Sequence, residues 1–249
     1  MMGVGENTAL IIGGSRGIGQ ATAEAFLAKG WKVGVSYHST NPDFLEAYPK
    51  DQWFASQLDV QNEDEIKRFF GEYKEAHGKK LDVFIYSSGI TIDALCIHSK
   101  TEDYDKVLST NLRGAYIFLR EIGHFMYYKK RGKMFFISSV SARRGGRGQL
   151  SYSVSKAGME SLVRVGAQEF SRAGIMVNAI APGVVETDMA KSVLDYVKDN
   201  KKDQGLFDRI AMRRVAKPAE IANFIFALSQ EEITYITGQT FHIDGGYML

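Results

Sequence analysis

Short apolar runs alternate with longer amphipathic stretches from one end of the chain to the other. Several of the short runs are apolar almost throughout, which is typical of strands buried on both faces of a parallel sheet. The longer stretches carry apolar residues at helical spacing, as crossover helices do. The alternation predicts one α/β domain over residues 1–249, with a seven-stranded, doubly wound parallel sheet and helices on both faces.

The expected elements follow directly from these runs. Strands are expected at 9–12, 32–36, 53–58, 83–86, 133–138, 176–180 and 240–243. Helices are expected at 17–29, 63–77, 101–130, 152–172 and 218–229. The segment 187–216 is polar, charged and weakly periodic, so we predict that it forms a mobile substrate lid. No internal repeat, linker or shift in composition marks a second domain.

Composition narrows the classes of function. With 45% hydrophobic residues, the 249-residue chain can bury a sizeable core. Lysine and arginine number 31 against 29 aspartates and glutamates, so the weak overall field favours neither a nucleic-acid partner nor an acidic membrane. Cys96 is the single cysteine, which excludes an intrachain disulfide. Since no signal peptide or membrane-spanning run is found, we expect a soluble, cytoplasmic protein.

A glycine-rich turn follows the first expected strand, in "IIGGSRGIGQATAEAF". Its glycines at 13, 14, 17 and 19 come directly before an amphipathic stretch, which gives the order strand, turn and helix. In this order, backbone N–H groups and the positive end of the helix bind a pyrophosphate. A tight turn without a ligand is the alternative, but the flanking strand and helix favour a dinucleotide site.

The end of the second strand predicts which dinucleotide binds. NAD sites usually have an acidic residue there, about 20 positions after the glycines, which binds the ribose 2′-hydroxyl. Here the residues at 36–39 are Ser, Tyr, His and Ser, so no carboxylate would repel a 2′-phosphate. Arg16 could reach that phosphate, together with the hydroxyls of Ser15, Ser36 and Ser39 and the ring of His38. We therefore predict NADP(H) rather than NAD(H) as cofactor.

A tyrosine and a lysine stand four residues apart in "SYSVSKAG", at Tyr152 and Lys156. Residues at this spacing share one face of a helix. Taken alone, such a pair is more often two solvated side chains than a catalytic pair. Ser139 changes this interpretation, because it follows an expected strand and would point into the ligand crevice at the carboxyl end of the sheet.

Taken together, these motifs resemble the short-chain dehydrogenase/reductase family over essentially the whole chain. The resemblance rests on Gly13-x-x-x-Gly17-x-Gly19, Asn111 in "NLRG", Ser139 and Tyr152-x-x-x-Lys156. It implies a single-domain Rossmann fold in which Tyr152 gives a proton to a substrate carbonyl and Ser139 hydrogen-bonds the same oxygen. It also implies that Lys156 holds the nicotinamide ribose, and that Asn111 holds a water linking Lys156 to solvent.

The motifs and the resemblance also predict the residues that bind the cofactor. They are Gly13, Ser15, Arg16, Gly17, Ile18, Gly19, Tyr37, His38, Ser39, Asp59, Val60, Ser88, Gly89, Tyr152, Lys156, Pro182, Gly183, Val185 and Thr187. An ammonium and a cationic oxidised nicotinamide near a phenol favour the phenolate, so we expect Lys156 and the bound cofactor to lower the pKa of Tyr152. One departure from the family concerns residues 86–89, which read Tyr-Ser-Ser-Gly instead of the usual Asn-Asn-Ala-Gly.

Within the family, the segments around Thr91 and Asp93 and near the C-terminus are most similar to the 3-oxoacyl-acyl-carrier-protein reductases. This implies the NADPH-dependent reduction of a 3-oxoacyl thioester, with acyl carrier protein as partner. Carrier proteins are acidic, so basic residues should surround the entrance of the site. The candidates are Lys129, Lys130, Arg131 and Arg172.

Three arginines lie between Ser139 and Tyr152, at positions 143, 144 and 147. They form either a solvated charged surface or a site for a phosphate or an anionic substrate.

Two alternatives for the function stay open: a reductase for another carbonyl, such as an aryl polyene or polyketide intermediate, a sugar or a polyol, and a non-catalytic NADP(H) sensor. The histidines and Cys96 lack metal-ligand spacing, so no metal site is expected. The resemblance implies a homotetramer.

Overall fold

The computed structural model describes residues 7–191, 194–195 and 205–249. It contains one sheet of seven parallel strands in the order β3-β2-β1-β4-β5-β6-β7. The strands are β1 (Thr8–Ile12), β2 (Lys32–Tyr37), β3 (Trp53–Gln57), β4 (Val83–Tyr86), β5 (Gly132–Ile137), β6 (Ile175–Pro182) and β7 (Thr240–Ile243). Every predicted strand is confirmed, with ends within two residues of those expected.

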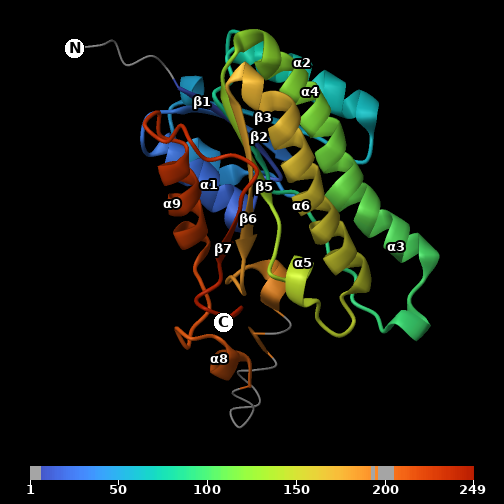
Figure 1. The fold of residues 1–249 in the computed structure, drawn as a ribbon. Coiled ribbons are helices and arrows are strands. Elements are labelled where there is room, and N and C mark those ends of the chain that lie inside the picture. Colours follow the sequence, from blue (N-terminus) through green and yellow to red (C-terminus); the bar gives the residue numbers. More distant parts are fainter. Residues whose placement is uncertain (1–6, 192–193, 196–204) are drawn as a thin grey trace.

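Helices cover both faces of this sheet (Figure 1). They are α1 (Gly17–Leu27), α2 (Glu63–Ala76), α3 (Thr101–Leu108), α4 (Gly114–Lys129), α5 (Ser141–Arg144), α6 (Leu150–Phe170), α8 (Gly205–Arg209) and α9 (Pro218–Leu228). Residues from α2, α4 and α6 share one hydrophobic core, and residues from α1 and α9 share the other. This arrangement confirms the predicted doubly wound Rossmann fold.

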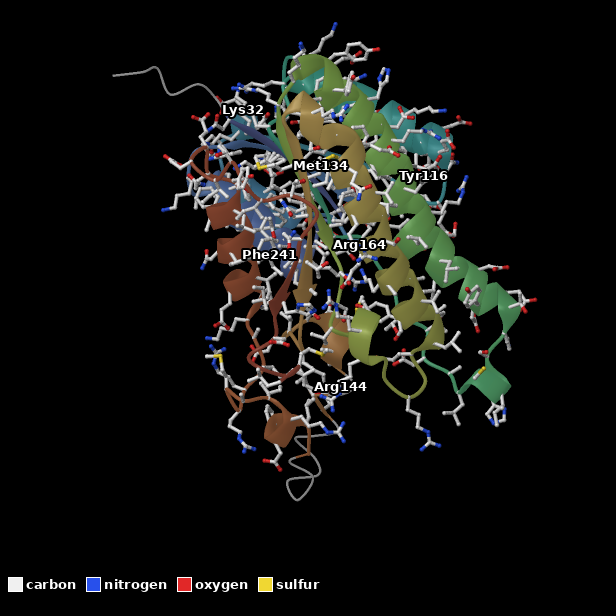
Figure 2. All side chains as sticks on the ribbon, in the orientation of Figure 1. Lys32, Tyr116, Met134, Arg144, Arg164 and Phe241 are labelled. Carbon is white, nitrogen blue, oxygen red and sulfur yellow. The ribbon has the colours of Figure 1, made fainter. Side chains whose placement is uncertain are left out.

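Along each central strand, side chains belong alternately to one core and to the other. In β4, Phe84 and Tyr86 belong to the core under α2, α4 and α6, whereas Val83 and Ile85 belong to the core under α1 and α9. Met134 of β5 lies inside the first core, while the outward residues Tyr116 of α4 and Arg164 of α6 are exposed (Figure 2). Among the described helices, none is long and apolar enough to cross a bilayer.

The predicted helix over 101–130 is interrupted. A π-helical turn, Ser109–Arg113, separates α3 from α4. The prediction was wrong here because the amphipathic pattern continues through the turn, and a single turn with i→i+5 hydrogen bonds hardly changes it. The turn buries Thr110 and Asn111, so it places a candidate catalytic residue. A second difference is α5, a single turn in the arginine-rich segment that the sequence did not predict.

The predicted lid at 187–216 is described only in part. It contains a 3₁₀ turn, Asp188–Ala190, and the short helix α8, while 192–193 and 196–204 lie outside the described residues. Val185 pairs with Ala216 in a parallel bridge, and Ala216 N–H donates to the Val184 carbonyl at 3.0 Å. The two ends of the segment are therefore joined at its base, and its mobility stays a prediction.

Candidate active site

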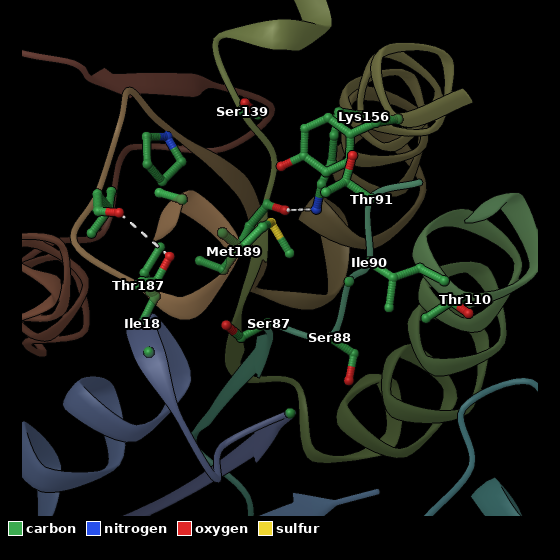
Figure 3. Close-up of a pocket in the computed structure, with 18 of the residues that line it drawn as sticks. Ile18, Ser87, Ser88, Ile90, Thr91, Thr110, Ser139, Lys156, Thr187 and Met189 are labelled. Carbon is green, nitrogen blue, oxygen red and sulfur yellow. Dashed lines mark hydrogen bonds between the residues drawn. The ribbon is translucent and has the colours of Figure 1, made fainter. Parts of the chain in front are cut away.

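A cavity of about 790 Å³ opens at the carboxyl ends of the strands and collects most of the predicted site residues. Figure 3 shows residues from several segments around it, among them Ser88, Ser139, Lys156 and Thr187. All of the predicted cofactor-binding residues except Gly19 line this cavity. Of the predicted catalytic residues, Ser139, Tyr152 and Lys156 line it, whereas Asn111 lies buried behind the wall.

The glycine loop forms a cradle that has no room for side chains. Gly13 has a φ of 77°, and a Cβ atom on Gly19 would lie 2.1 Å from the Gly13 carbonyl oxygen. Gly19 therefore does not line the cavity, and its missing side chain lets α1 pack closely against the turn. The N-terminus of α1 has no side-chain cap and no acidic residue in its first turn. Such free N–H groups at a helix N-terminus fit a pyrophosphate.

The residues after β2 lie where a ribose 2′-phosphate would be recognised. Tyr37, His38 and Ser39 line the cavity without a carboxylate between them. The Ser36 hydroxyl accepts a hydrogen bond from Gly13 N–H at 3.0 Å, and Ser36 is buried, so its place is in the glycine turn. Arg16 is exposed and forms an ion pair with Asp188 at 3.4 Å. The sequence did not indicate this carboxylate. The ion pair would have to break before Arg16 could bind a phosphate.

Lys156 is buried one helical turn after Tyr152 on α6. Its Nζ donates to the Ile137 carbonyl at 2.6 Å, the dashed line beside Lys156 in Figure 3, and lies 5.6 Å from the centre of the Tyr152 ring. Burial disfavours the ammonium and lowers the pKa of Lys156 to about 8. Near neutral pH the lysine is thus charged, with a proton that it can lose more readily than an exposed lysine.

Ser139 follows the end of β5 and accepts a hydrogen bond from Ser141 N–H at 3.1 Å through its Oγ. The Tyr152 phenol and this hydroxyl both line the cavity. Burial raises the pKa of Tyr152, and the Asp93 charge adds to the rise, while the Ser139 hydroxyl opposes it. These causes act in the chain without a cofactor, so the lowering expected from Lys156 together with an oxidised nicotinamide stays a prediction.

Asn111 connects the π-helical turn to two other segments. Its Oδ1 accepts from Ile90 N–H at 2.8 Å, and its Nδ2 donates to the Ile90 carbonyl at 2.9 Å and to Ser155 Oγ at 3.0 Å. A Cβ atom on Gly89 would lie 3.4 Å from both Asn111 Oδ1 and Lys156 Nζ. The amide therefore faces the lysine across a glycine, and its predicted role with a water stays a prediction.

Some lining residues were missed by the sequence analysis. Ser87, Ile90 and Asp188 adjoin predicted positions, so neighbourhood in the sequence could have indicated them. Tyr247 comes from the C-terminal tail and no motif pointed to it. Arg144 donates to the Tyr247 carbonyl at 3.1 Å and lies over its ring, 4.9 Å from the centre. This tertiary contact is what brings the tail to the cavity.

Comparison with known proteins agrees with this geometry. A family model described as enoyl-(acyl carrier protein) reductase matches residues 12–248. The chain belongs to the short-chain dehydrogenase/reductase family of oxidoreductases, which confirms the resemblance seen in the motifs.

Three similar proteins share one description. A 3-oxoacyl-[acyl-carrier-protein] reductase FabG from Staphylococcus epidermidis is 33% identical, over 96% of this chain and 98% of its own. MabA of Mycobacterium tuberculosis, with the same described activity, is 34% identical over 95% of this chain and 91% of its own. A 3-oxoacyl-[acyl-carrier-protein] reductase from Synechocystis is 35% identical over 97% of this chain and 96% of its own.

Solved structures show the same fold. ElxO with NADP bound has a TM-score of 0.88 and 26% identity, covering 98% of this chain and 99% of its own. A protein from Agrobacterium tumefaciens, provisionally described as a gluconate dehydrogenase, has a TM-score of 0.89 and 29% identity, with coverage of 98% and 97%.

Proposed function

We propose that this protein reduces the 3-oxo group of an acyl thioester carried on acyl carrier protein, with NADPH as the reductant. The observation that carries the proposal is the group of side chains at the cavity: Ser139 and Tyr152 both line it, and the buried Lys156 has its Nζ 5.6 Å from the centre of the Tyr152 ring. Support for the substrate class comes from relatives described as 3-oxoacyl-[acyl-carrier-protein] reductases.

The cavity fits a nicotinamide dinucleotide along its length. The glycine loop and the N-terminus of α1 would hold the pyrophosphate, and Tyr37, His38 and Ser39 would surround the adenosine ribose. Asp59 and Thr187 line the same cavity further along. When bound, the nicotinamide supplies the hydride that reduces a carbonyl carbon.

Side chains of the protein stabilise the negative charge that develops on the carbonyl oxygen of the substrate. The Ser139 oxygen already accepts from Ser141 N–H, so its hydroxyl hydrogen is left to donate. Tyr152 has a raised pKa and stays protonated, as a proton donor must. Both groups stabilise the negative charge that grows on the substrate oxygen. After Tyr152 gives up its proton, the Lys156 ammonium stabilises the phenolate that remains.

The preference for NADPH over NADH can be tested by replacing Arg16. We expect a higher kcat/KM with NADPH than with NADH, because no carboxylate lies among residues 36–39. Arg16→Ala should raise the KM for NADPH and leave that for NADH unchanged, since a guanidinium binds the 2′-phosphate that NADH lacks. Equal kcat/KM for the two cofactors in the wild type would contradict the assignment.

The reduction should weaken at alkaline pH. Burial lowers the pKa of Lys156 to about 8, so its charge is present below that pH and is lost above it. We expect kcat/KM to fall above about pH 8, because this ratio reports ionisations of the free enzyme. The measurement is kcat/KM from pH 6 to pH 10 with a substrate that does not itself titrate, while circular dichroism checks folding. A flat profile for a folded enzyme would refute the role of the ammonium.

The structure separates the three arginines upstream of Tyr152. Arg143 pairs with the buried Glu160 at 3.5 Å, and Arg144 is bound to Tyr247. Arg147 is exposed and lines the cavity, and within the described part of the chain it makes no hydrogen bond or ion pair. We assign Arg147 to the phosphate of the carrier's prosthetic group, since its guanidinium is available for one.

Carrier recognition is tested by charge reversal. Arg147→Glu should raise the KM for a carrier-linked 3-oxoacyl substrate at least about tenfold, the effect of losing a charge-assisted contact of about 1.4 kcal/mol. The KM for a short thioester that lacks a phosphate should stay unchanged. Lys29→Glu, at an exposed site beyond α1, is the matched control. An equal rise for both substrates would exclude carrier recognition at Arg147.

Two observations favour substrates other than a 3-oxoacyl thioester. The matching family model is described as an enoyl reductase, and one structural relative is provisionally described as a gluconate dehydrogenase. Arg144 and Arg147 also suit a small anionic oxo acid. The deciding experiment follows NADPH oxidation with acetoacetyl and crotonyl thioesters on carrier and on coenzyme A, beside oxo sugar acids. Turnover of crotonyl thioester alone, or of a sugar acid alone, would replace the proposed substrate.

We also propose a homotetramer assembled through α4 and α6. Support comes from large side chains on these helices that are exposed in the single chain, with Tyr116 and Val165 each 51% exposed. Covering such side chains between copies would bury apolar surface. Light scattering after gel filtration should give the mass of four chains.

A further inference from the structure

Tyr86 ends β4 and is the first of the three residues in the segment 86–89 that depart from the family pattern. It is fully buried, and its ring packs near Phe118 and Phe136, with centroid distances of 5.9 Å and 6.2 Å. Its phenol donates to the Thr110 carbonyl at 2.5 Å. Burial raises the pKa of Tyr86, so the phenol is a permanent donor.

The acceptor belongs to the π-helical turn. In this turn, Gly114 N–H donates to the Ser109 carbonyl, five residues back, which is the spacing of a π-helix. Tyr86 supplies a donor to the next carbonyl, Thr110, from outside the helix. A Cβ atom on Gly114 would lie 2.5 Å from the phenol oxygen, so the glycine leaves the space that the phenol occupies. Tyr86 thus fixes the geometry of the turn.

A chain of hydrogen bonds leads from this turn to the catalytic helix. Asn111, next to Thr110, binds the backbone of Ile90 with both ends of its amide. It also donates to Ser155 Oγ, which in turn donates to the Tyr152 carbonyl at 2.7 Å. The chain joins β4, the cavity wall at 87–90 and the first turns of α6.

We propose that Tyr86 is a positioning residue for the reduction. Its phenol holds the π-helical turn so that Asn111 can tie the loop after β4 to the helix that carries Tyr152 and Lys156. Tyr86 thereby supports the turn that carries Asn111 from one buried side chain. The inference rests on the proposed function, because it assigns Tyr86 a role in that reaction.

The test replaces Tyr86 by Phe, which removes one oxygen atom and keeps the ring. We expect kcat to fall about tenfold, since small misplacements of catalytic groups are costly, while the Kd for NADPH stays unchanged. Tyr73→Phe is the matched control. Tyr73 is also fully buried, and its phenol donates to the Lys80 carbonyl at 3.1 Å, beside α2 and away from the cavity. The control should lose thermal stability but keep the wild-type kcat.

The possible outcomes separate this inference from the proposed function. A wild-type kcat for Tyr86→Phe, or equal losses of kcat in both Phe variants, would overturn the role of Tyr86. If Tyr86→Phe does not fold, Ser155→Ala breaks the same chain at its other end and should lower kcat without changing the Kd for NADPH; a wild-type kcat there would overturn the inference. Failure of the proposed function shows separately, as turnover that persists in Tyr152→Phe.

Discussion

Replacing Tyr152 by Phe should lower kcat about a thousandfold and leave NADPH binding intact. The substitution removes the proton donor and keeps the ring that packs beside Lys156. General acid catalysis by a positioned side chain contributes about 10²- to 10⁴-fold. The measurement is single-turnover reduction under saturating NADPH, with the Kd for NADPH determined by fluorescence titration.

A suitable control is Tyr128→Phe, because Tyr128 lies at the end of α4 and is 73% exposed. This variant should keep the wild-type kcat and thermal midpoint. Turnover by Tyr152→Phe at the wild-type rate would show that another group gives the proton, and the proposed mechanism would then be wrong. Loss of NADPH affinity in the same variant would instead assign Tyr152 to cofactor binding.

Gly19→Ala should disrupt dinucleotide binding. The added Cβ would lie 2.1 Å from the Gly13 carbonyl oxygen, and this oxygen belongs to the backbone of the loop that holds the pyrophosphate. Overpacking of this kind costs about 1–3 kcal/mol, which corresponds to a weakening of NADPH binding by about 5- to 150-fold if the loop is displaced. Isothermal titration of the variant with NADPH measures the change.

The matched control is Gly71→Ala. Gly71 lies inside α2, and a Cβ atom there would meet nothing within 4 Å. Both substitutions replace a helical glycine by a better helix former, which favours the helix by about 1 kcal/mol. Gly71→Ala should therefore be at least as stable as the wild type and bind NADPH normally. An unchanged Kd for Gly19→Ala would mean that the loop opens elsewhere to bind the cofactor.

The sheet could be predicted because its signal is local. A buried parallel strand such as β4 reads as a short apolar run, and the glycines after β1 fix where the first turn must lie. The π-helical turn could not be predicted, since it preserves the amphipathic pattern of the helices on either side. Its effect is tertiary: it depends on the phenol that reaches Thr110 from another element.

The candidate site was also predictable only in part from the sequence. Residues in contiguous motifs, such as the glycine loop and the Tyr152 segment, lie together at the cavity as the order of the strands requires. The ion pair of Arg16 with Asp188 joins residues 172 positions apart, so no local pattern indicates it. The surroundings of Tyr152 give a related example: its proximity to Lys156 is visible in the sequence, but the depth of burial that raises its pKa is not.

The bridge between Val185 and Ala216 makes the segment above it exchangeable. When the two ends of a loop are fixed to each other, a change in its length costs little, about 0.6 kcal/mol for each doubling. Residues of this segment line the cavity. On the proposed function, we expect that a segment from a relative, placed between these two residues, would change which carbonyl compound the same strands and the same proton donor act on.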